Sequence, residues 1–337
     1  MATITHRKAG YQAQVRRKGY PAVSASFTTK RDAQAWARQI ENELDRGLFL
    51  SRTEAEKQTL GDILDRYRRE VSPTHKGVAN ETICITALKR DAVCGYRASA
   101  LSGKLLAEWR DRRMKAVSAA TVNRELNLIS SAINVARKEW GIHIENPVTL
   151  IRRPPSGKSR TRRLNGDELQ RLLAALNVSD RQPDGTYGGG ARNHWIAPIV
   201  SLAVETAMRQ GELLKLMWQD VNLTDRTAHL PDTKNGEART VPLSSRAIEI
   251  LSRLPHSITG RVFPMTKRAV HQAFRRACNR ANISDLRFHD LRHEGVSRLF
   301  ELGLNPMEVA SISGHRTLAM LQRYTHLKAS ELVKKLA

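Results

Sequence analysis

The sequence predicts a multi-domain, mainly α-helical protein with small β elements. Its 337 residues suffice for about two domains, with room for a small third. Near the N-terminus apolar and polar side chains alternate, which is the period of strands, and from residue 59 to residue 140 apolar side chains recur at helical spacing. After a short basic segment the rest of the chain mixes helical patterns with a hairpin pattern, so we expect a mixed α+β domain there.

Residues 1–50 form the first expected domain, a small β-sheet plus one helix. Alternation around Tyr11 predicts a strand, Val23 to Phe27 predicts another, and an amphipathic helix is expected from Lys30 to Arg46. The first 31 residues contain cations and no acidic residue. A basic two-stranded ribbon can enter the major groove of DNA, whereas a solvated edge hairpin needs no ligand, and this segment alone leaves both interpretations open. The candidate DNA contacts here are Arg16, Arg17 and Lys18.

Residues 59–150 form the second expected domain, a four-helix bundle. Thr59 and Asp62 have the spacing of a capping box, which starts a helix by satisfying its first backbone N–H groups. Asn146-Pro147 ends the bundle, because the residue before a proline is biased out of the helical conformation. The other helices are expected over residues 80–91, 102–114 and 118–140.

Residues 151–163 are expected to be a basic linker, since they combine prolines, a glycine and serines with six cations and no anion. A run of charges is most often simply solvated. In a chain with a net charge of +23, however, a basic segment between two domains is well placed to lie along phosphates. The expected phosphate contacts are Arg152, Arg153, Lys158, Arg160, Arg162 and Arg163.

Residues 164–337 form the last expected domain, which begins at a capping box of Asn165 and Glu168. Asn235-Gly236 is typical of a tight hairpin turn, and residues 180–193 are expected to be a polar, glycine-rich surface loop. Strands are expected near residues 221–223, 228–230 and 240–243, and helices near 196–206, 209–217, 245–254, 268–281, 289–301, 305–313 and 317–323. We predict that the helix over residues 268–281 meets DNA through Arg275, Arg276 and Arg280.

Composition excludes several classes of protein. The chain has 56 Lys and Arg against 33 Asp and Glu, and this excess of +23 points to a polyanionic partner such as nucleic acid. Its 3 cysteines form no C-x-x-C pair, which fits a reducing cytosol rather than a disulfide scaffold. The N-terminus has no apolar signal segment, and no apolar run approaches the ~20 residues that span a bilayer. We therefore expect neither a secreted nor a membrane protein.

The sequence also argues against a metal or cofactor. The P-loop pattern that cradles nucleotide phosphates is absent from it. His289 and His293 have the spacing of a zinc-binding pair, but the glutamate of H-E-x-x-H is missing, and Arg292 would place a cation beside the metal. No G-x-S-x-G pattern supports catalysis by a serine nucleophile.

Polar residues of the last domain are candidates for chemistry, although each has a structural explanation when taken alone. Arg209 follows an apolar segment, and it either points into a site or pairs with Glu212 three positions later. His289 and Arg292 share one helical face, where a guanidinium fork and an imidazole suit a single anion.

Three further candidates are equally ambiguous alone: Lys234 lies at a hairpin tip, His315 follows a helix end, and Tyr324 can pack in a core. Taken in order, the candidates form one set: Arg209, Lys234, His289-x-x-Arg292, Gly314-His315, and Tyr324 nine residues after that histidine. This set resembles the signature of the tyrosine recombinases, or phage-type integrases. Residues 59–150 resemble the core-binding domain of that family, residues 1–50 its small arm-binding domain, and residues 164–337 its catalytic domain.

The resemblance implies a role for each member of the set. Tyr324 would attack the scissile phosphate, giving a 3′-phosphotyrosyl intermediate and a free 5′-hydroxyl, while Arg209 and Arg292 donate to the non-bridging oxygens. The other implied roles are protonation of the leaving oxygen by Lys234, assistance to the tyrosine proton by His289, a hydrogen bond to the phosphate by His315, and orientation of neighbouring groups by Glu212.

The same resemblance implies a site-specific recombinase that integrates or excises a mobile element or prophage without ATP, metal or another cofactor. It implies double-stranded DNA as the partner at core and arm-type sites, a homotetramer on DNA, accessory DNA-bending and excision factors, and a location at the nucleoid in the cytoplasm of a bacterial host. The tail at residues 329–337 would dock on a neighbouring protomer, or else pack in cis. Two alternatives stay open: a type IB topoisomerase-like activity, and a non-catalytic DNA-binding regulator.

Overall fold

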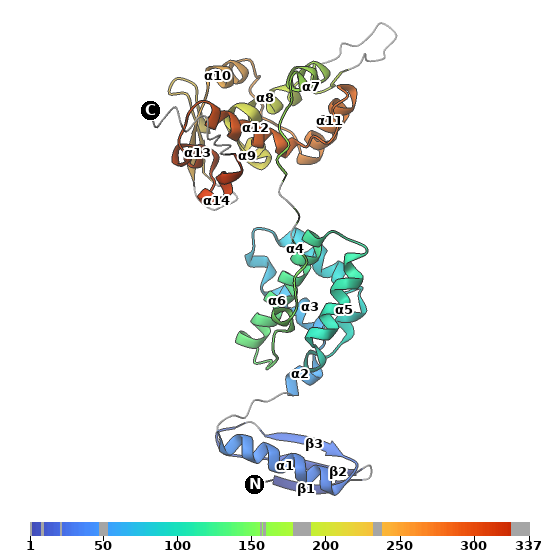
Figure 1. Ribbon diagram of the computed structural model, residues 1–337. Coiled ribbons are helices and arrows are strands. Elements are labelled where there is room, and N and C mark those ends of the chain that lie inside the picture. Colours follow the sequence, from blue (N-terminus) through green and yellow to red (C-terminus); the bar gives the residue numbers. More distant parts are fainter. Residues whose placement is uncertain are drawn as a thin grey trace, which may run out of the picture. The chain divides into compact units, whose positions relative to one another are not determined.

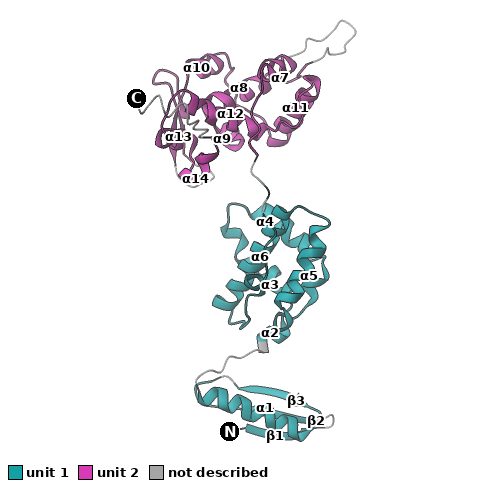
Figure 2. Ribbon diagram, viewed as in Figure 1, with its two compact units in different colours: residues 1–158 teal, residues 159–337 magenta. Residues whose placement is uncertain are grey.

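The computed structural model describes residues 2–7, 10–20, 22–46, 53–155, 157, 160–177, 190–231 and 238–324. The chain divides into two compact units, residues 1–158 and residues 159–337, each of which is described by itself (Figure 2). The boundary between them falls inside the segment 151–163 that we expected to be a linker. Several predicted features lie outside the described residues: Lys158, Lys234, the Asn235-Gly236 turn, the tail at 329–337 and most of the loop at 180–193.

The N-terminal part of the first unit is an antiparallel sheet with a helix on one face (Figure 1). The Thr29 side chain caps the helix by accepting a hydrogen bond from the backbone N–H of Asp32 at 3.1 Å. The first strand was not predicted from the sequence; it pairs with the second from Ala2 opposite Val15 to Arg7 opposite Gly10. The elements are β1 (Ala2–Arg7), β2 (Gly10–Val15), β3 (Val23–Phe27) and α1 (Lys30–Asp45).

The rest of the first unit is helical (Figure 1). The expected capping box is present, because the Asp62 carboxylate accepts from the backbone N–H of Thr59 at 2.9 Å and the Thr59 hydroxyl accepts from the backbone N–H of Asp62 at 3.1 Å. Trp109 and the apolar face of the longest helix are buried in one core. The helices are α2 (Thr53–Lys57), α3 (Leu60–Glu70), α4 (Val78–Leu88), α5 (Gly103–Met114) and α6 (Ala119–Glu139).

The second unit is built around the apolar helix α8 (Ile196–Thr206), which packs against α7, α10, α11 and α12. Its strands form one antiparallel sheet in the order β4-β5-β6. The strands are β4 (Val221–Asn222), β5 (Thr227–Leu230) and β6 (Arg239–Pro242). The other helices are α7 (Glu168–Leu176), α9 (Gln210–Lys215), α10 (Ser245–Ser252), α11 (Lys267–Arg280), α12 (Phe288–Glu301), α13 (Pro306–Ser313) and α14 (Leu318–Leu321).

Several helix ends differ from the prediction, and two of these differences lie at the start and the end of the last domain. Helix α7 starts at Glu168, because Gly166 adopts a positive φ of 50° and residues 166–167 form a turn. Only half of the expected capping box forms there, in which the Glu168 carboxylate accepts from the backbone N–H of Asn165 at 2.8 Å. The last predicted helix is a short α14 followed by a 3-10 turn at Gln322–Tyr324. Among the residues described, no helix is both long and apolar enough to cross a bilayer.

Candidate active site

A close crossing of α8 and α12 positions the two predicted arginines. A Cβ atom on Gly295 of α12 would lie 2.5 Å from the carbonyl oxygen of Val204 and 3.1 Å from the Cα atom of Ala207, so glycine is needed there. Ala207 ends α8 with a positive φ of 51°, which turns the chain back into the helix that starts after Arg209. The crossing therefore brings the end of α8 to within reach of Arg292 on α12.

Arg292 is buried, with only 3% of its surface exposed. Its Nη1 atom donates to the carbonyl oxygen of Ala207 at 2.6 Å and its Nη2 atom to that of Ser313 at 2.7 Å. Burial, reinforced by the charge of Arg209, lowers the pKa of Arg292 to about 9, so the side chain is still a cation at neutral pH. A buried cation held by neutral carbonyl groups favours the binding of an anion.

Arg209 is fixed by the carboxylate of Glu212, three residues further along the chain. Its Nη1 atom donates to Glu212 at 2.9 Å and its Nη2 atom to the carbonyl oxygen of Gly314 at 3.1 Å. The structural pairing considered in the sequence analysis is therefore present, and the same pair orients the guanidinium. Arg209 reaches the loop that precedes the predicted His315 as well.

A third arginine, Arg239 at the start of β6, clamps the other side of Glu212. Its Nη1 and Nη2 atoms donate to the Glu212 carboxylate at 3.0 and 2.7 Å. Burial alone would raise the pKa of Glu212, but Arg239 and the Arg209 backbone N–H outweigh it and hold this pKa at about 2. Arg239 was not predicted from the sequence. The Glu212 carboxylate thus binds two guanidiniums, those of Arg209 and Arg239, and its charge also acts on Arg292. Three cations surround one anion, so these four side chains together carry a net positive charge.

His315 closes the site next to Arg292, just beyond the left-handed Gly314 that ends α13. The Ser313 hydroxyl donates to the Val309 carbonyl at 2.6 Å, so it accepts the hydrogen bond that joins it to His315 Nδ1 at 2.7 Å. The other ring nitrogen, Nε2, lies 3.4 Å from Arg292 Nη2. Burial, followed by the charges of Arg292 and Arg209, lowers the pKa of His315 to about 3, so the imidazole is neutral.

Tyr324 lies in the 3-10 turn after α14, and its ring centroid is 6.0 Å from that of His315. The residue is 8% exposed, and burial raises the pKa of its phenol. The phenol oxygen forms a hydrogen bond with His293 Nδ1, a partner that the sequence analysis did not predict. The predicted His289 is exposed at the start of α12, with its ring centroid 5.2 Å from that of His293.

The structure thus gathers Arg209, Glu212, Arg292, His315 and Tyr324 into one site of the second unit. His289 adjoins this site through its ring contact with His293, and Lys234 lies outside the described residues. Within the described part of the chain, no group of three or more His, Cys, Asp or Glu side chains could hold a metal ion.

Three of the linker arginines that we predicted to contact DNA form ion pairs within the second unit. Arg160 pairs with Asp290 at 2.9 Å, Arg163 with Glu294 at 3.1 Å, and Arg162 with the carboxylate of Glu168. Two of these carboxylates lie on α12, where they are nearly inaccessible to solvent, and a buried carboxylate needs a partner. These three cations therefore stabilise the second unit, and their contact with DNA phosphates stays a prediction.

The remaining predicted DNA contacts are in varied surroundings. Arg275 and Arg276 are exposed on α11, whereas Arg280 donates to the carbonyl of Ala175 at 2.5 Å. Arg17 forms an exposed ion pair with Asp45. Arg153 is exposed and donates to the Asn127 side chain at 2.7 Å. The other exposed members of the set are Arg16, Lys18 and Arg152.

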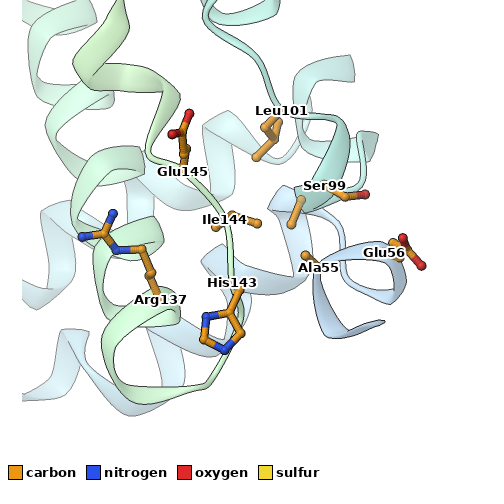
Figure 3. A pocket seen from close by; sticks show the side chains of 9 residues that line it. Ala55, Glu56, Ser99, Leu101, Arg137, His143, Ile144 and Glu145 are labelled. Carbon is orange, nitrogen blue, oxygen red and sulfur yellow. The ribbon is translucent and has the colours of Figure 1, made fainter. Parts of the chain in front are cut away.

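A separate hollow lies in the helical part of the first unit (Figure 3). Arg137, His143 and Glu145 line one part of it, and Ala55, Ser99 and Leu101 line another. None of the predicted catalytic residues contributes to this hollow.

A net positive buried site with two guanidiniums, a neutral imidazole and a tyrosine phenol defines a class of enzyme that transfers DNA strands through tyrosine. The chain belongs to the phage integrase family, the tyrosine recombinases, which matches residues 162–331. It is a tyrosine-type site-specific recombinase that acts on DNA.

Individual relatives agree with this assignment. A shufflon-specific DNA recombinase of Escherichia coli is 42% identical over 289 residues, which cover 83% of this chain and 72% of that protein. A putative integrase/recombinase of Haemophilus influenzae is 36% identical over 329 residues, covering 96% and 86%. A lambda integrase tetramer bound to a Holliday junction has the same fold, with a TM-score of 0.63 at 22% identity. That match covers 96% of this chain and 97% of the lambda chain, so the shared fold includes the N-terminal sheet.

Proposed function

We propose that this recombinase cuts and rejoins DNA strands through a 3′-phosphotyrosine at Tyr324, and that it integrates or excises a mobile element or prophage. The observation that carries the proposal is the net positive, buried cluster around Glu212, into which the Tyr324 phenol packs beside His315. A scissile phosphate supplies the anion that this cluster lacks.

In this proposal Arg209 and Arg292 bind the non-bridging oxygens of the phosphate. Each η nitrogen carries two hydrogens, so the contacts of Arg292 with two carbonyl groups leave N–H donors for a ligand. Donors fixed in advance toward developing charge are commonly worth ~3–4 kcal/mol each in the transition state. Glu212 acts as a positioning residue, because it holds Arg209 while Arg239 holds the carboxylate.

The remaining roles concern protons and the bond that breaks. As the Tyr324 oxygen bonds to phosphorus, the 5′ oxygen leaves and takes a proton from Lys234, since an ammonium can release a proton that a guanidinium retains. We assign assistance to the tyrosine proton to the histidines of α12, including the predicted His289. We assign a hydrogen bond to the phosphate to His315, whose Nε2 donates once the Ser313 hydroxyl turns from the Val309 carbonyl to donate to Nδ1. Because the phosphotyrosine conserves the bond energy, a second 5′-hydroxyl can reverse the step without ATP, metal or another cofactor.

We further propose a homotetramer on double-stranded DNA, with core and arm-type sites and with accessory DNA-bending and excision factors. The similarity to the lambda integrase tetramer on a Holliday junction supports this arrangement. The tail at 329–337, which lies outside the described residues, would dock on a neighbouring protomer. The relatives from Escherichia coli and Haemophilus influenzae support a bacterial host, where the protein would act at the nucleoid in the cytoplasm.

Cations outside the site are the proposed DNA contacts. Arg275 and Arg276 occupy the face of α11 opposite Phe274 and Ala277, which are buried in the core. The other members of the proposed set are Arg16, Arg17, Lys18, Arg152, Arg153, Arg160, Arg162, Arg163, Arg280 and Lys158, the last of which lies outside the described residues. The exposed pair of Arg17 with Asp45 is worth at most ~1 kcal/mol, so a phosphate can replace the carboxylate at little cost.

One experiment tests the proposed chemistry and identifies the DNA site at the same time. The protein is incubated with fragmented DNA of its host, the reaction is stopped with detergent, and DNA that remains attached to protein is sequenced. We expect wild type to capture a defined site and Tyr324→Phe to capture none. Capture by both proteins, or by neither, would contradict the proposed chemistry. Captured sites placed on supercoiled plasmids then separate recombination from the relaxation expected of a type IB topoisomerase-like enzyme.

A further inference from the structure

The phenol of Tyr324 has a specific partner in the described structure, the imidazole of His293. Both residues are 8% exposed, and their ring centroids lie 5.5 Å apart. The hydrogen bond joins the phenol oxygen to His293 Nδ1 and links residues 31 positions apart in the chain. His293 is the residue directly after Arg292, so the helix that presents a guanidinium to the phosphate also presents this imidazole to the tyrosine.

His293 is able to accept a proton at neutral pH. Burial, followed by the neighbouring His289 and then by the cations Arg323 and Arg292, lowers the pKa of His293 to about 4, although Asp290 opposes this effect. The imidazole is therefore neutral and has one nitrogen with a free lone pair. When Nε2 carries the proton, Nδ1 accepts the hydrogen bond from the phenol.

We propose that His293 is a further catalytic residue, which receives the proton of Tyr324 as the phenol oxygen attacks the scissile phosphate. This inference rests on the proposed role of Tyr324 as the nucleophile. The bond from the phenol oxygen to phosphorus forms, the bond from phosphorus to the 5′ oxygen breaks, and the phenol proton moves to Nδ1. The leaving 5′ oxygen takes its own proton from Lys234. When a 5′-hydroxyl attacks the phosphotyrosine, both protons return, so a complete exchange consumes none.

A weakly basic imidazole suits this step. The proton of the phenol becomes strongly acidic only while the phenol oxygen bonds to phosphorus, so a strong base is not required before that moment. The negative charge that develops on the phosphate then stabilises the imidazolium nearby. His289 is exposed on the preceding turn, and its ring lies nearly edge-on against His293, with 79° between the ring planes. His289 thus acts on the tyrosine through His293.

The competing explanation is that His293 only holds the phenol in place, and glutamine separates the two roles. His293→Gln retains a hydrogen-bonding side chain but cannot take up a proton. His293→Ala leaves space in which imidazole from solution can bind and act as the proton acceptor. The matched control is His143→Gln, which replaces an exposed histidine of the first unit.

The experiment measures single-turnover formation of the covalent adduct on a nicked substrate that carries the captured site. We expect His293→Gln to lower the rate by about 100-fold or more, the usual minimum for a lost proton acceptor, while His143→Gln matches wild type. Added imidazole should accelerate adduct formation by His293→Ala in proportion to the concentration of neutral imidazole. The same addition should have no effect on Tyr324→Phe.

A substrate with sulfur in place of the 5′ oxygen provides a second readout, because sulfur leaves without needing a proton. With this substrate Lys234→Ala should form the adduct at nearly the wild-type rate, whereas His293→Gln should remain slow. The inference is overturned if His293→Gln reacts within threefold of wild type, or if the sulfur substrate restores it. Should His293→Ala fail to fold, the comparison with glutamine and the sulfur substrate decides. If wild type forms no adduct, or if Tyr324→Phe still forms one, the proposed role of Tyr324 as the nucleophile is refuted instead.

Discussion

Replacing Glu212 with glutamine should destabilise the catalytic unit in a way that depends on pH. The pKa of this carboxyl is about 2 in the folded protein against an ordinary value of 4.5, because Arg239 and Arg209 bind the buried carboxylate. A folded pKa below the unfolded one stabilises the protein above pH 4.5, and this contribution is lost as the pH falls from 4.5 through 2. The difference of ~2.5 between the folded and unfolded pKa values contributes about 3 kcal/mol to the free energy of unfolding at pH 7.

We therefore expect Glu212→Gln to lower the free energy of unfolding by about 3 kcal/mol at pH 7 and by only about 2 kcal/mol at pH 3.5. Urea denaturation of the full chain, followed by pulsed hydrogen exchange in peptides of α8 and α12, reports on this unit separately from the first. Glu249→Gln, at a half-exposed carboxylate of α10 that pairs with Arg246, is the matched control and should change less than ~1 kcal/mol. A Glu212→Gln deficit below ~1 kcal/mol at pH 7, or one that is equal at both pH values, would refute the reasoning.

Three further perturbations test other parts of the structure. Gly295→Ala should lower the free energy of unfolding by ~1–3 kcal/mol and reduce adduct formation, because its Cβ would collide with α8. Gly211→Ala, with open space around it, should be tolerated. Similar unfolding midpoints for the two variants would contradict this expectation. Arg163→Ala should lower the free energy of unfolding of the second unit by ~1–3 kcal/mol and speed hydrogen exchange in α12. Unchanged exchange would show that the linker is not anchored to this helix. The logarithm of the DNA-binding constant falls linearly with the logarithm of the salt concentration, and Arg275→Gln and Arg276→Gln should each make this slope shallower by about 1. Adduct formation at saturating DNA should not change. An unchanged slope would show that α11 is not part of the DNA interface.

Local signals in the sequence were sufficient for much of the fold. The capping box of Thr59 and Asp62 involves residues three positions apart, so its pattern is visible before any tertiary structure is known. The pairing of Arg209 with Glu212 has the same short range. The ordered set of candidate residues also predicted the family, which the comparisons confirm.

Contacts between distant segments were not predictable in this way. Arg239 reaches Glu212 across 27 residues and His293 reaches Tyr324 across 31, and both contacts depend on the tertiary fold. The ion pair of Arg160 with Asp290 was not predicted either, because Asp290 lies 130 residues further along the chain. A cation with no nearby acid in the sequence looks free, although the fold supplies it with a buried carboxylate.

The central claim is that Tyr324 becomes joined to DNA, and mass spectrometry of the trapped adduct tests it most directly. Wild-type protein is trapped on a nicked substrate and digested with protease and nuclease, and the peptide that retains a nucleotide is fragmented. We predict a phosphodiester that joins the phenol oxygen of Tyr324 to the 3′ end of the DNA. A nucleotide on another side chain, or a linkage to a 5′ end, would contradict the account.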